Sequence, residues 1–183
     1  RNFYKTASPS MDILVSSNLE RLLFELSGRD TSLIKKIYAD LKEKGEFTFD
    51  LSLLRNSIFE AGWADEEETK EAIYNYFDLD DVTFDPHTAV AGSVYNDYSI
   101  DTEDDTTTII VSTASPYKFA ASVLNALGES AEMDEFATVD ALQTLTGTTP
   151  PAPITALKGK EVRFNNICEP ETMEQAVLSH LGI

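Results

Sequence analysis

The sequence is poor in cysteine and in histidine. Cys168 is its single cysteine, and His87 and His180 are its two histidines. One cysteine excludes a disulfide within the chain and is typical of proteins from a reducing compartment, so we expect a cytoplasmic protein. No CxxC, HxxxH or HExxH spacing occurs, which excludes the common zinc motifs, and we expect no metal site.

Positive charge is also scarce. Lys and Arg total 14 against 32 Asp and Glu, which gives a formal net charge of −18 and a sequence pI of about 4.3. Because like charges repel over a Debye length of ~8–10 Å, nucleic acids and anionic membranes are poor partners. No run approaches the about 18 uncharged apolar residues of a membrane span, and no signal-peptide pattern opens the chain. With 42% hydrophobic residues, the chain is nevertheless too apolar for a disordered acidic tail.

Glycine-rich loops are missing. The eight glycines are scattered, and most of them stand where a helical pattern stops. The sequence therefore has no phosphate-binding loop of the glycine-rich kind, and it has no GxSxG nucleophile elbow. The acidic stretch 78–85 lacks the glycine and the final glutamate of a calcium loop, so it is interpreted as a solvated surface.

Apolar residues recur at helical spacing along most of the chain. Asn18 is the predicted N-cap of a first helix that buries the leucines at 19, 22, 23 and 26 and ends at Gly28. Residues 30–79 are predicted to be almost entirely helical, with Asp65 and Glu68 as a capping box. Further helices are predicted to begin at Asp85-Pro86 and at Ser115-Pro116, and to cover 139–145 and 170–181.

Three short segments are predicted to be strands, over residues 11–15, 107–111 and 161–164. The β-branched run 107–111 is the clearest of them, and a helix start follows it directly. A strand that leads straight into a helix is half of an α/β crossover unit. The predicted fold class is therefore α/β, rich in helix and with few strands.

Three stretches combine helix starts with polar loop residues. They read TASPSMDI and SSNLER over residues 6–13 and 16–21, DPHTAV over 85–90, and STASPYKF over 112–119. Together and in this order they resemble the C-terminal part of threonine synthase, a pyridoxal-phosphate enzyme of fold type II. Each stretch is moderately specific, whereas three in order make a strong match. The resemblance extends to the closing regions 151–157 and 162–164 and so covers nearly the whole chain.

The resemblance implies that much of the enzyme lies outside these residues. In the family, the Schiff-base lysine lies in a Phe-Lys-Asp-type motif and a Gly-Asn-x-Gly loop holds the cofactor phosphate, both upstream of the matching region. Neither motif occurs here, and the chain opens with Arg1 in place of Met. We therefore expect residues 1–28 and 86–183 to be the C-terminal part of the large domain, with 29–85 as a helical insertion or subdomain. The missing N-terminal half is the expected partner, and the chain alone is expected to be inactive.

The resemblance also implies a reaction and a cofactor contact. Threonine synthase converts O-phospho-L-homoserine and water to L-threonine and phosphate, with pyridoxal phosphate as the electron sink and the lysine as acid and base. Thr113 stands where the family has the threonine that hydrogen-bonds the pyridine nitrogen of the cofactor. Ser115 stands where the family often has histidine, which leaves the role of that side chain open. From the residues alone, Thr113 is better explained as a strand-ending threonine bonded to its own backbone, and only the family resemblance favours the cofactor contact.

Other candidate substrate-binding residues have two interpretations each. Ser16, Ser17 and Asn18 open a helix, where backbone amides either receive a phosphate or are simply capped. Arg21 either pairs with a substrate anion or with Glu25 one turn further along the helix. His87 is either a substrate ligand or a first-turn histidine that is hydrogen-bonded within the fold.

Two competing functions stay open at this point. Another fold type II lyase, such as a serine or threonine dehydratase, fits the class, although the stretches 85–90 and 112–119 favour threonine synthase. The alternative outside enzymes is a free-standing, noncatalytic helical interaction module. The reading frame upstream of Arg1 would decide between this module and an enzyme. Because strands without partners leave apolar edges exposed, self-association of the chain is a further expectation.

Overall fold

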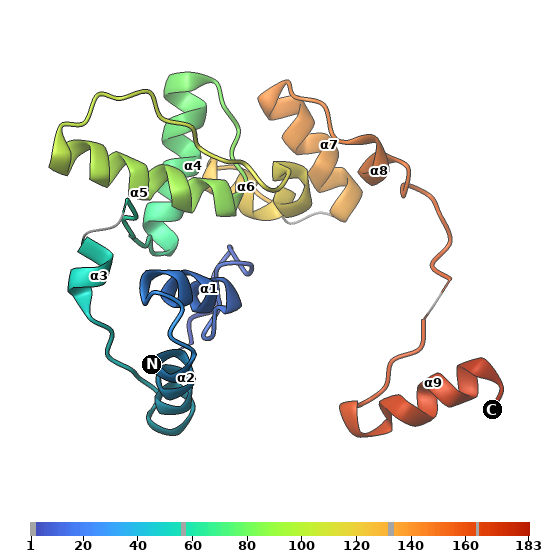
Figure 1. Ribbon diagram of the computed structural model, residues 1–183. Helices are drawn as coiled ribbons and strands as arrows, with labels where there is room; N and C mark the ends of the chain where they lie inside the picture. Colours follow the sequence, from blue (N-terminus) through green and yellow to red (C-terminus); the bar gives the residue numbers. More distant parts are fainter. Residues whose placement is uncertain (1–2, 56–57, 132–133, 164) are drawn as a thin grey trace. The chain divides into compact units, whose positions relative to one another are not determined.

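The computed structural model describes residues 3–55, 58–131, 134–163 and 165–183. The chain separates into two compact units, Arg1–Pro151 and Ala152–Ile183. In the described ranges all regular structure is helical (Figure 1). The first unit contains α1 (Ser17–Leu26), α2 (Thr31–Lys44), α3 (Leu51–Arg55), α4 (Glu66–Asp80), α5 (Pro86–Thr102), the 3-10 helix η1 (Pro116–Phe119), α6 (Ala120–Ala126) and α7 (Glu135–Thr146).

Aspartates begin most of the long helices. Asp30 caps α2, Asp65 caps α4, Asp85 caps α5 and Asp134 caps α7, each accepting hydrogen bonds from two backbone amides of the first turn. A cap of this kind stabilises a helix by about 1 kcal/mol. The predicted capping box of Asp65 and Glu68 is present, with both side-chain bonds formed.

The predicted N-cap of the first helix is wrong by two residues. Ser16, rather than Asn18, caps α1, and its hydroxyl accepts a hydrogen bond of 3.3 Å from the amide of Leu19. Tyr38 of α2 fixes Ser16 in place, because its hydroxyl donates to the Ser16 carbonyl at 3.1 Å. Burial and the nearby carboxylate of Glu20 raise the pKa of Tyr38, so this donor keeps its proton.

Helices α1 and α2 pack into a small hydrophobic core. Its buried members are Leu23, Ile34 and Ile37. Leu23 is one of the leucines predicted to be buried, whereas Leu19 is 41% exposed. The prediction that residues 30–79 are almost entirely helical is wrong for the part between α2 and α4. Helix forms there as α3 (Leu51–Arg55), and Ile58 beyond it is 95% exposed, so it does not take part in a core. Residues 56 and 57 lie outside the described residues.

The larger core lies among α4, α5, α6 and α7. Helix α4 packs against α5 and α6, and α6 packs against α7 (Figure 1). Gly92 of α5 permits the close approach of α4. A Cβ atom there would lie 2.8 Å from a ring carbon of Tyr76 and 3.2 Å from one of Phe84. The fully buried side chains of this core include Ile73, Val123, Leu124 and Leu142.

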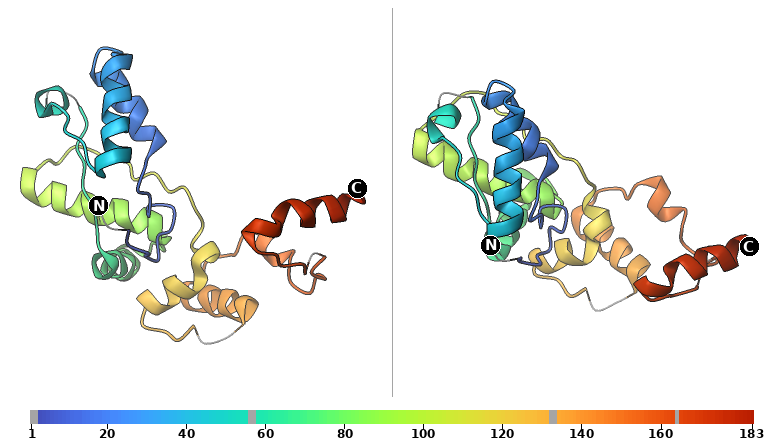
Figure 2. Two further views of the ribbon diagram at one scale, coloured as in Figure 1. Left: turned by 90° about the horizontal axis from the view of Figure 1, so that it is seen from below. Right: turned by 60° about the horizontal axis from the view of Figure 1, so that its bottom comes forward.

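The predicted strands do not form within the described residues. Residues 107–111 are irregular chain, with Ile109 84% and Val111 70% exposed. Figures 1 and 2 show this segment as a loop that leads from α5 to η1, with no strand beside it. A strand needs a hydrogen-bonding neighbour, and no strand lies beside this segment among the described residues. The helix-rich character is confirmed, but the strands of an α/β fold are not seen.

The other two predicted strands differ from expectation in the same way. Residues 11–15 form a turn and a bend, in which the amide of Met11 donates to the carbonyl of Ser8 at 2.8 Å. Residues 161–163 are irregular, and residue 164 lies outside the described residues. The predicted division at 28/29 and 85/86 remains a prediction.

The second unit is small and open. It contains α8 (Ala152–Thr155), the 3-10 helix η2 (Pro170–Thr172) and α9 (Met173–Leu181), with no buried side chain among its described residues. The predicted C-terminal helix over 170–181 is therefore present as η2 and α9. Cys168 is exposed in the segment that precedes η2. Among the described residues, no helix has both the length and the apolarity needed to cross a membrane.

Candidate functional site

The first turn of α5 carries a buried polar cluster. Asp85 is 1% exposed, and its Oδ1 accepts hydrogen bonds from the amides of His87 at 2.9 Å and Thr88 at 3.4 Å. Its other oxygen, Oδ2, accepts a hydrogen bond from the hydroxyl of Thr88. Pro86 occupies the first helical position, as the sequence predicts, because proline has no amide to satisfy there. The carboxylate of Asp85 thus accepts three hydrogen bonds, and these fix the first turn of α5.

His87 links this turn to the N-terminal segment. Its Nδ1 lies 2.5 Å from the hydroxyl oxygen of Ser8, a residue 79 positions away in the sequence, and both side chains are buried. The imidazole packs edge-on against Phe119, with ring centroids 4.7 Å apart and an interplanar angle of 73°. Its Nε2 is buried and has no hydrogen-bond partner among the described residues. His87 is thus hydrogen-bonded inside the fold, and it keeps one unpaired nitrogen.

Thr88 links the same turn to the loop before η1. Its Oγ1 lies 3.2 Å from the hydroxyl oxygen of Ser112. Because Thr88 gives its single hydroxyl proton to Asp85, Ser112 is the donor in this contact, and the carbonyl of Ala114 at 3.3 Å is the alternative acceptor for the same Ser112 proton. Thr113 stands between these two residues and is exposed. The first turn of α5 therefore contacts parts of all three stretches that the sequence singles out.

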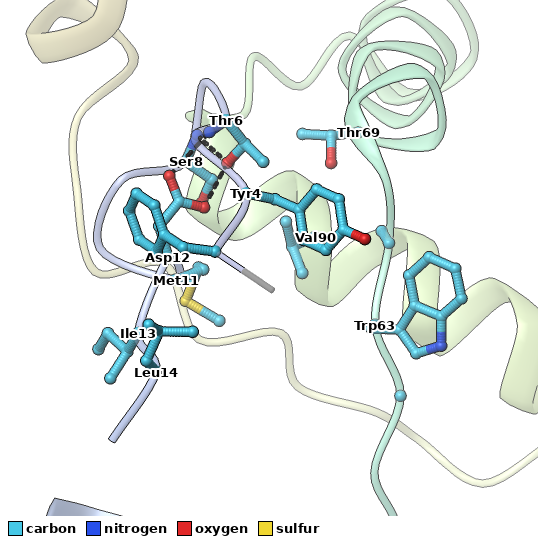
Figure 3. A pocket seen from close by; sticks show the side chains of 13 residues that line it. Tyr4, Thr6, Ser8, Met11, Asp12, Ile13, Leu14, Trp63, Thr69 and Val90 are labelled. Atoms are coloured by element: carbon cyan, nitrogen blue, oxygen red, sulfur yellow. Dashed lines mark hydrogen bonds between the residues drawn. The ribbon is translucent and has the colours of Figure 1, made fainter. Parts of the chain in front are cut away.

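The N-terminal segment folds around Asp12. The two carboxylate oxygens of Asp12 accept from the amide of Thr6 at 2.8 Å and from its hydroxyl at 2.7 Å (Figure 3). The amide of Ala7 donates to Glu66 in the first turn of α4 at 3.0 Å. This segment forms one side of a cleft of about 310 Å³, which is lined across from it by Trp63, among others.

The candidates on α1 lie in a different place. Ser17 and Arg21 line a groove of about 500 Å³ together with Lys35 of α2, while Ser16 caps the helix and Asn18 lies in its first turn. The predicted alternative for Arg21, a pair with Glu25, is wrong. Glu25 pairs instead with Arg29, whose Nε lies 3.0 Å from its carboxylate. Within the described part of the chain Arg21 has no ion pair, so its charge is available to a ligand.

Sequence reasoning missed the residues that join the stretches. Ser8, Thr88 and Ser112 lie inside the stretches quoted from the sequence, yet none of them was assigned a role. A signal existed for Thr88, since a threonine three positions after an Asp cap is placed to donate to that carboxylate. No local signal indicates that Ser8 or Ser112 would meet α5.

The comparisons with known proteins point to one family. The family model described as "Threonine synthase, C-terminal" matches residues 88–177. Threonine synthase-like 1 of Homo sapiens is 35% identical over 130 residues, which are 69% of this chain and 17% of that protein. The threonine synthase of Corynebacterium glutamicum is 33% identical over 137 residues, 72% of this chain and 28% of that protein.

Solved structures agree in fold. The crystal structure of PLP-bound threonine synthase from Brucella melitensis matches with a TM-score of 0.61 and 35% identity, over 78% of this chain and 30% of that one. Yeast threonine synthase matches with a TM-score of 0.74 and 26% identity, over 99% of this chain and 37% of that one. The chain thus spans less than a third of the curated relatives described above.

Proposed function

This chain is a relative of the threonine synthases that corresponds to their C-terminal portion, and we propose that it is part of an enzyme which converts O-phospho-L-homoserine and water to L-threonine and phosphate. The observation that carries the proposal is the convergence on the first turn of α5. There, Ser8, His87 and the Thr88–Ser112 contact hold together the stretches by which the chain resembles this family. The identity of the substrate and of the products rests on the family relationship.

The residues around Thr113 fit a pyridoxal phosphate ring. Thr113 is exposed, and Ser112 beside it is held by contacts to Thr88 and Ala114. When bound, pyridoxal phosphate supplies an electron sink for charge that develops on the α and β carbons of the substrate. The hydroxyl of Thr113 would hold the pyridine nitrogen. Because this hydroxyl is neutral, it does not keep that nitrogen protonated as an aspartate would.

The groove on α1 suits a substrate anion. Two cations, Arg21 and Lys35, and one carboxylate, Glu20, line it, which leaves one net positive charge. The groove lies next to the first turn of α1, where backbone amides and the helix dipole favour negative charge. We assign Ser16, Ser17, Asn18 and Arg21 to the recognition of the substrate phosphate. His87 is a further substrate-binding candidate through its unpaired Nε2.

The rest of the enzyme would supply what these residues lack. The lysine and phosphate-loop motifs of the family do not occur in the sequence, so the chain alone would release no phosphate. The exposed run 107–111 would become a strand beside strands of the N-terminal half, which supports an α/β parent. On this proposal residues 1–28 and 86–183 belong to the large domain, 29–85 form a helical subdomain, and the enzyme works in the cytoplasm.

Phosphate release from O-phospho-L-homoserine tests the proposal in the full-length enzyme that contains this chain. The wild-type enzyme should release phosphate and form threonine, and it should not deaminate serine at a comparable rate. Thr113→Val should weaken cofactor binding and shift the cofactor absorbance. Turnover of serine in place of O-phospho-L-homoserine would favour a dehydratase and refute the proposal, as would phosphate release by the 183-residue chain alone.

A further inference from the structure

One hydrogen-bonded chain joins a helix cap to the loop that presents Thr113. In it the hydroxyl of Thr88 donates to the carboxylate of Asp85, and the Thr88 oxygen accepts from the hydroxyl of Ser112 at 3.2 Å. We propose that Thr88, held by Asp85, is a positioning residue that fixes the orientation of Thr113 toward the cofactor ring. This assignment rests on the proposed function, since it assumes that Thr113 meets the cofactor.

The Asp85–Thr88 end of this series of hydrogen bonds is rigid. Asp85 is 1% and Thr88 is 2% exposed, and both stand at the start of α5, which packs against α4. Asp85 receives three donors, so the Thr88 side chain is held in a single orientation. A buried hydroxyl held in this way is a firm attachment point for a loop.

The loop itself has few other attachments. Upstream, residues 107–111 form no strand, and their exposed side chains provide little packing. Downstream, Ser115 caps η1 by accepting from the amide of Tyr117 at 3.3 Å, and the hydroxyl of buried Tyr117 donates to the carbonyl of Thr148 at 2.9 Å. Thr113 therefore lies between two restrained positions. The Thr88–Ser112 contact holds the residue before it, and the capped helix η1 begins shortly after it.

Loss of the Thr88 contact would free one side of Thr113. Without that contact the backbone of Thr113 gains conformational freedom, which a bound ring would have to overcome. The hydroxyl of Thr113 would then point toward the ring for a smaller fraction of the time. Cofactor affinity should fall although no residue that touches the cofactor has changed.

Thr88→Val tests the role of the Thr88–Ser112 contact, because valine keeps the branched shape of threonine and removes its hydroxyl. Thr138→Val is the matched control. Thr138 is also buried near the start of an Asp-capped helix, but its hydroxyl donates to the carbonyl of Asp134 at 2.9 Å within α7. Thr88→Ser, which restores a hydroxyl, is the conservative rescue variant.

The first measurement needs no activity. The NMR backbone order parameters of residues 112–114 should fall in Thr88→Val relative to wild type and stay unchanged in Thr138→Val, because the Thr88–Ser112 contact restrains this loop. Equal order parameters in Thr88→Val and wild type would overturn the assignment. The same fall in Thr138→Val would overturn it too, since the effect would then be general loss of stability.

The second measurement uses the cofactor-loaded full-length enzyme. Thr88→Val should bind pyridoxal phosphate about tenfold more weakly and show an altered cofactor spectrum, whereas Thr88→Ser should stay within about twofold of wild type. If Thr113→Val changes the cofactor spectrum and Thr88→Val does not, the positioning role fails while the proposed function stands. If Thr113→Val itself leaves cofactor affinity and spectrum unchanged, the assignment of Thr113 to the cofactor fails and the positioning role with it, whereas phosphate release from O-phospho-L-homoserine still decides the proposed reaction.

Discussion

Replacement of the Asp85 cap should destabilise the protein far more than replacement of the similar cap at Asp30. Both carboxylates accept from two first-turn amides, at 2.9 and 3.4 Å for Asp85 and at 2.9 and 3.0 Å for Asp30. Asp30 is exposed, so water can replace its carboxylate. Asp85 is buried, and it also holds the hydroxyl of Thr88.

The expected magnitudes follow from these environments. Loss of an exposed N-cap costs about 1 kcal/mol, which we expect for Asp30→Ala. Asp85→Ala loses the same cap and also leaves a buried hydroxyl without its acceptor, which adds about 1–3 kcal/mol. Ser112 remains within 3.2 Å of that hydroxyl, which places the total toward the lower end, at about 2–3 kcal/mol.

Urea unfolding followed by circular dichroism measures both variants. The unfolding midpoint should fall for both, and about two to three times further for Asp85→Ala, with an unchanged dependence of the free energy on urea concentration. Asp134→Ala, another exposed cap, should behave like Asp30→Ala. Free energies of unfolding for Asp85→Ala and Asp30→Ala that agree within about 0.5 kcal/mol would refute the reasoning, because burial and Thr88 would then contribute nothing.

Two further predictions concern the core and one tyrosine. Leu142→Ala should lower the free energy of unfolding by about 2–5 kcal/mol, because Leu142 of α7 is fully buried. Leu157→Ala on the exposed surface should change it by less than about 0.5 kcal/mol, and chemical denaturation measures both. The hydrogen bond that Tyr98 donates to Asp104 at 2.9 Å, together with the charge of that carboxylate, raises the pKa of Tyr98 above 10.0. Asp104→Asn should therefore lower this pKa, and an NMR titration of the Tyr98 ring between about pH 8 and 12 would contradict the assignment if the midpoint stayed in place or rose. Since the pKa is raised in the folded state, the stabilisation from this contact should be present below about pH 10 and be lost as the pH rises through the pKa of folded Tyr98.

Helix boundaries could be predicted from the sequence because their causes are local. Asp65 with Glu68, and Asp85 with Pro86, carry complete start signals within four residues, and the structure has both helices. Gly45 and Gly147 end their helices with positive φ of 79° and 66°, a conformation that glycine adopts without strain. The N-cap of α1 could not be predicted in the same way, because a contact from Tyr38, on the next helix, helps to hold Ser16.

The strands and the polar cluster depend on distant residues. The run 107–111 has strong β propensity, but propensity cannot supply the neighbouring strand that the described residues lack. The candidate status of Thr113 and His87 came from family resemblance, whereas their surroundings came from contacts with Ser8 and Ser112 that no local pattern encodes. The sequence therefore pointed to the correct stretches without showing how they meet.

The exposed segment between α5 and η1 should make the isolated chain prone to aggregation. Residues 106–112 read TTTIIVS and contain no charge, no proline and no glycine. Seven-residue segments of that composition stack readily into fibrillar zippers when nothing shields them. Concentrated solutions of the isolated polypeptide should slowly form thioflavin-positive aggregates, and Ile109→Lys should suppress them, because a charge within such a segment opposes stacking.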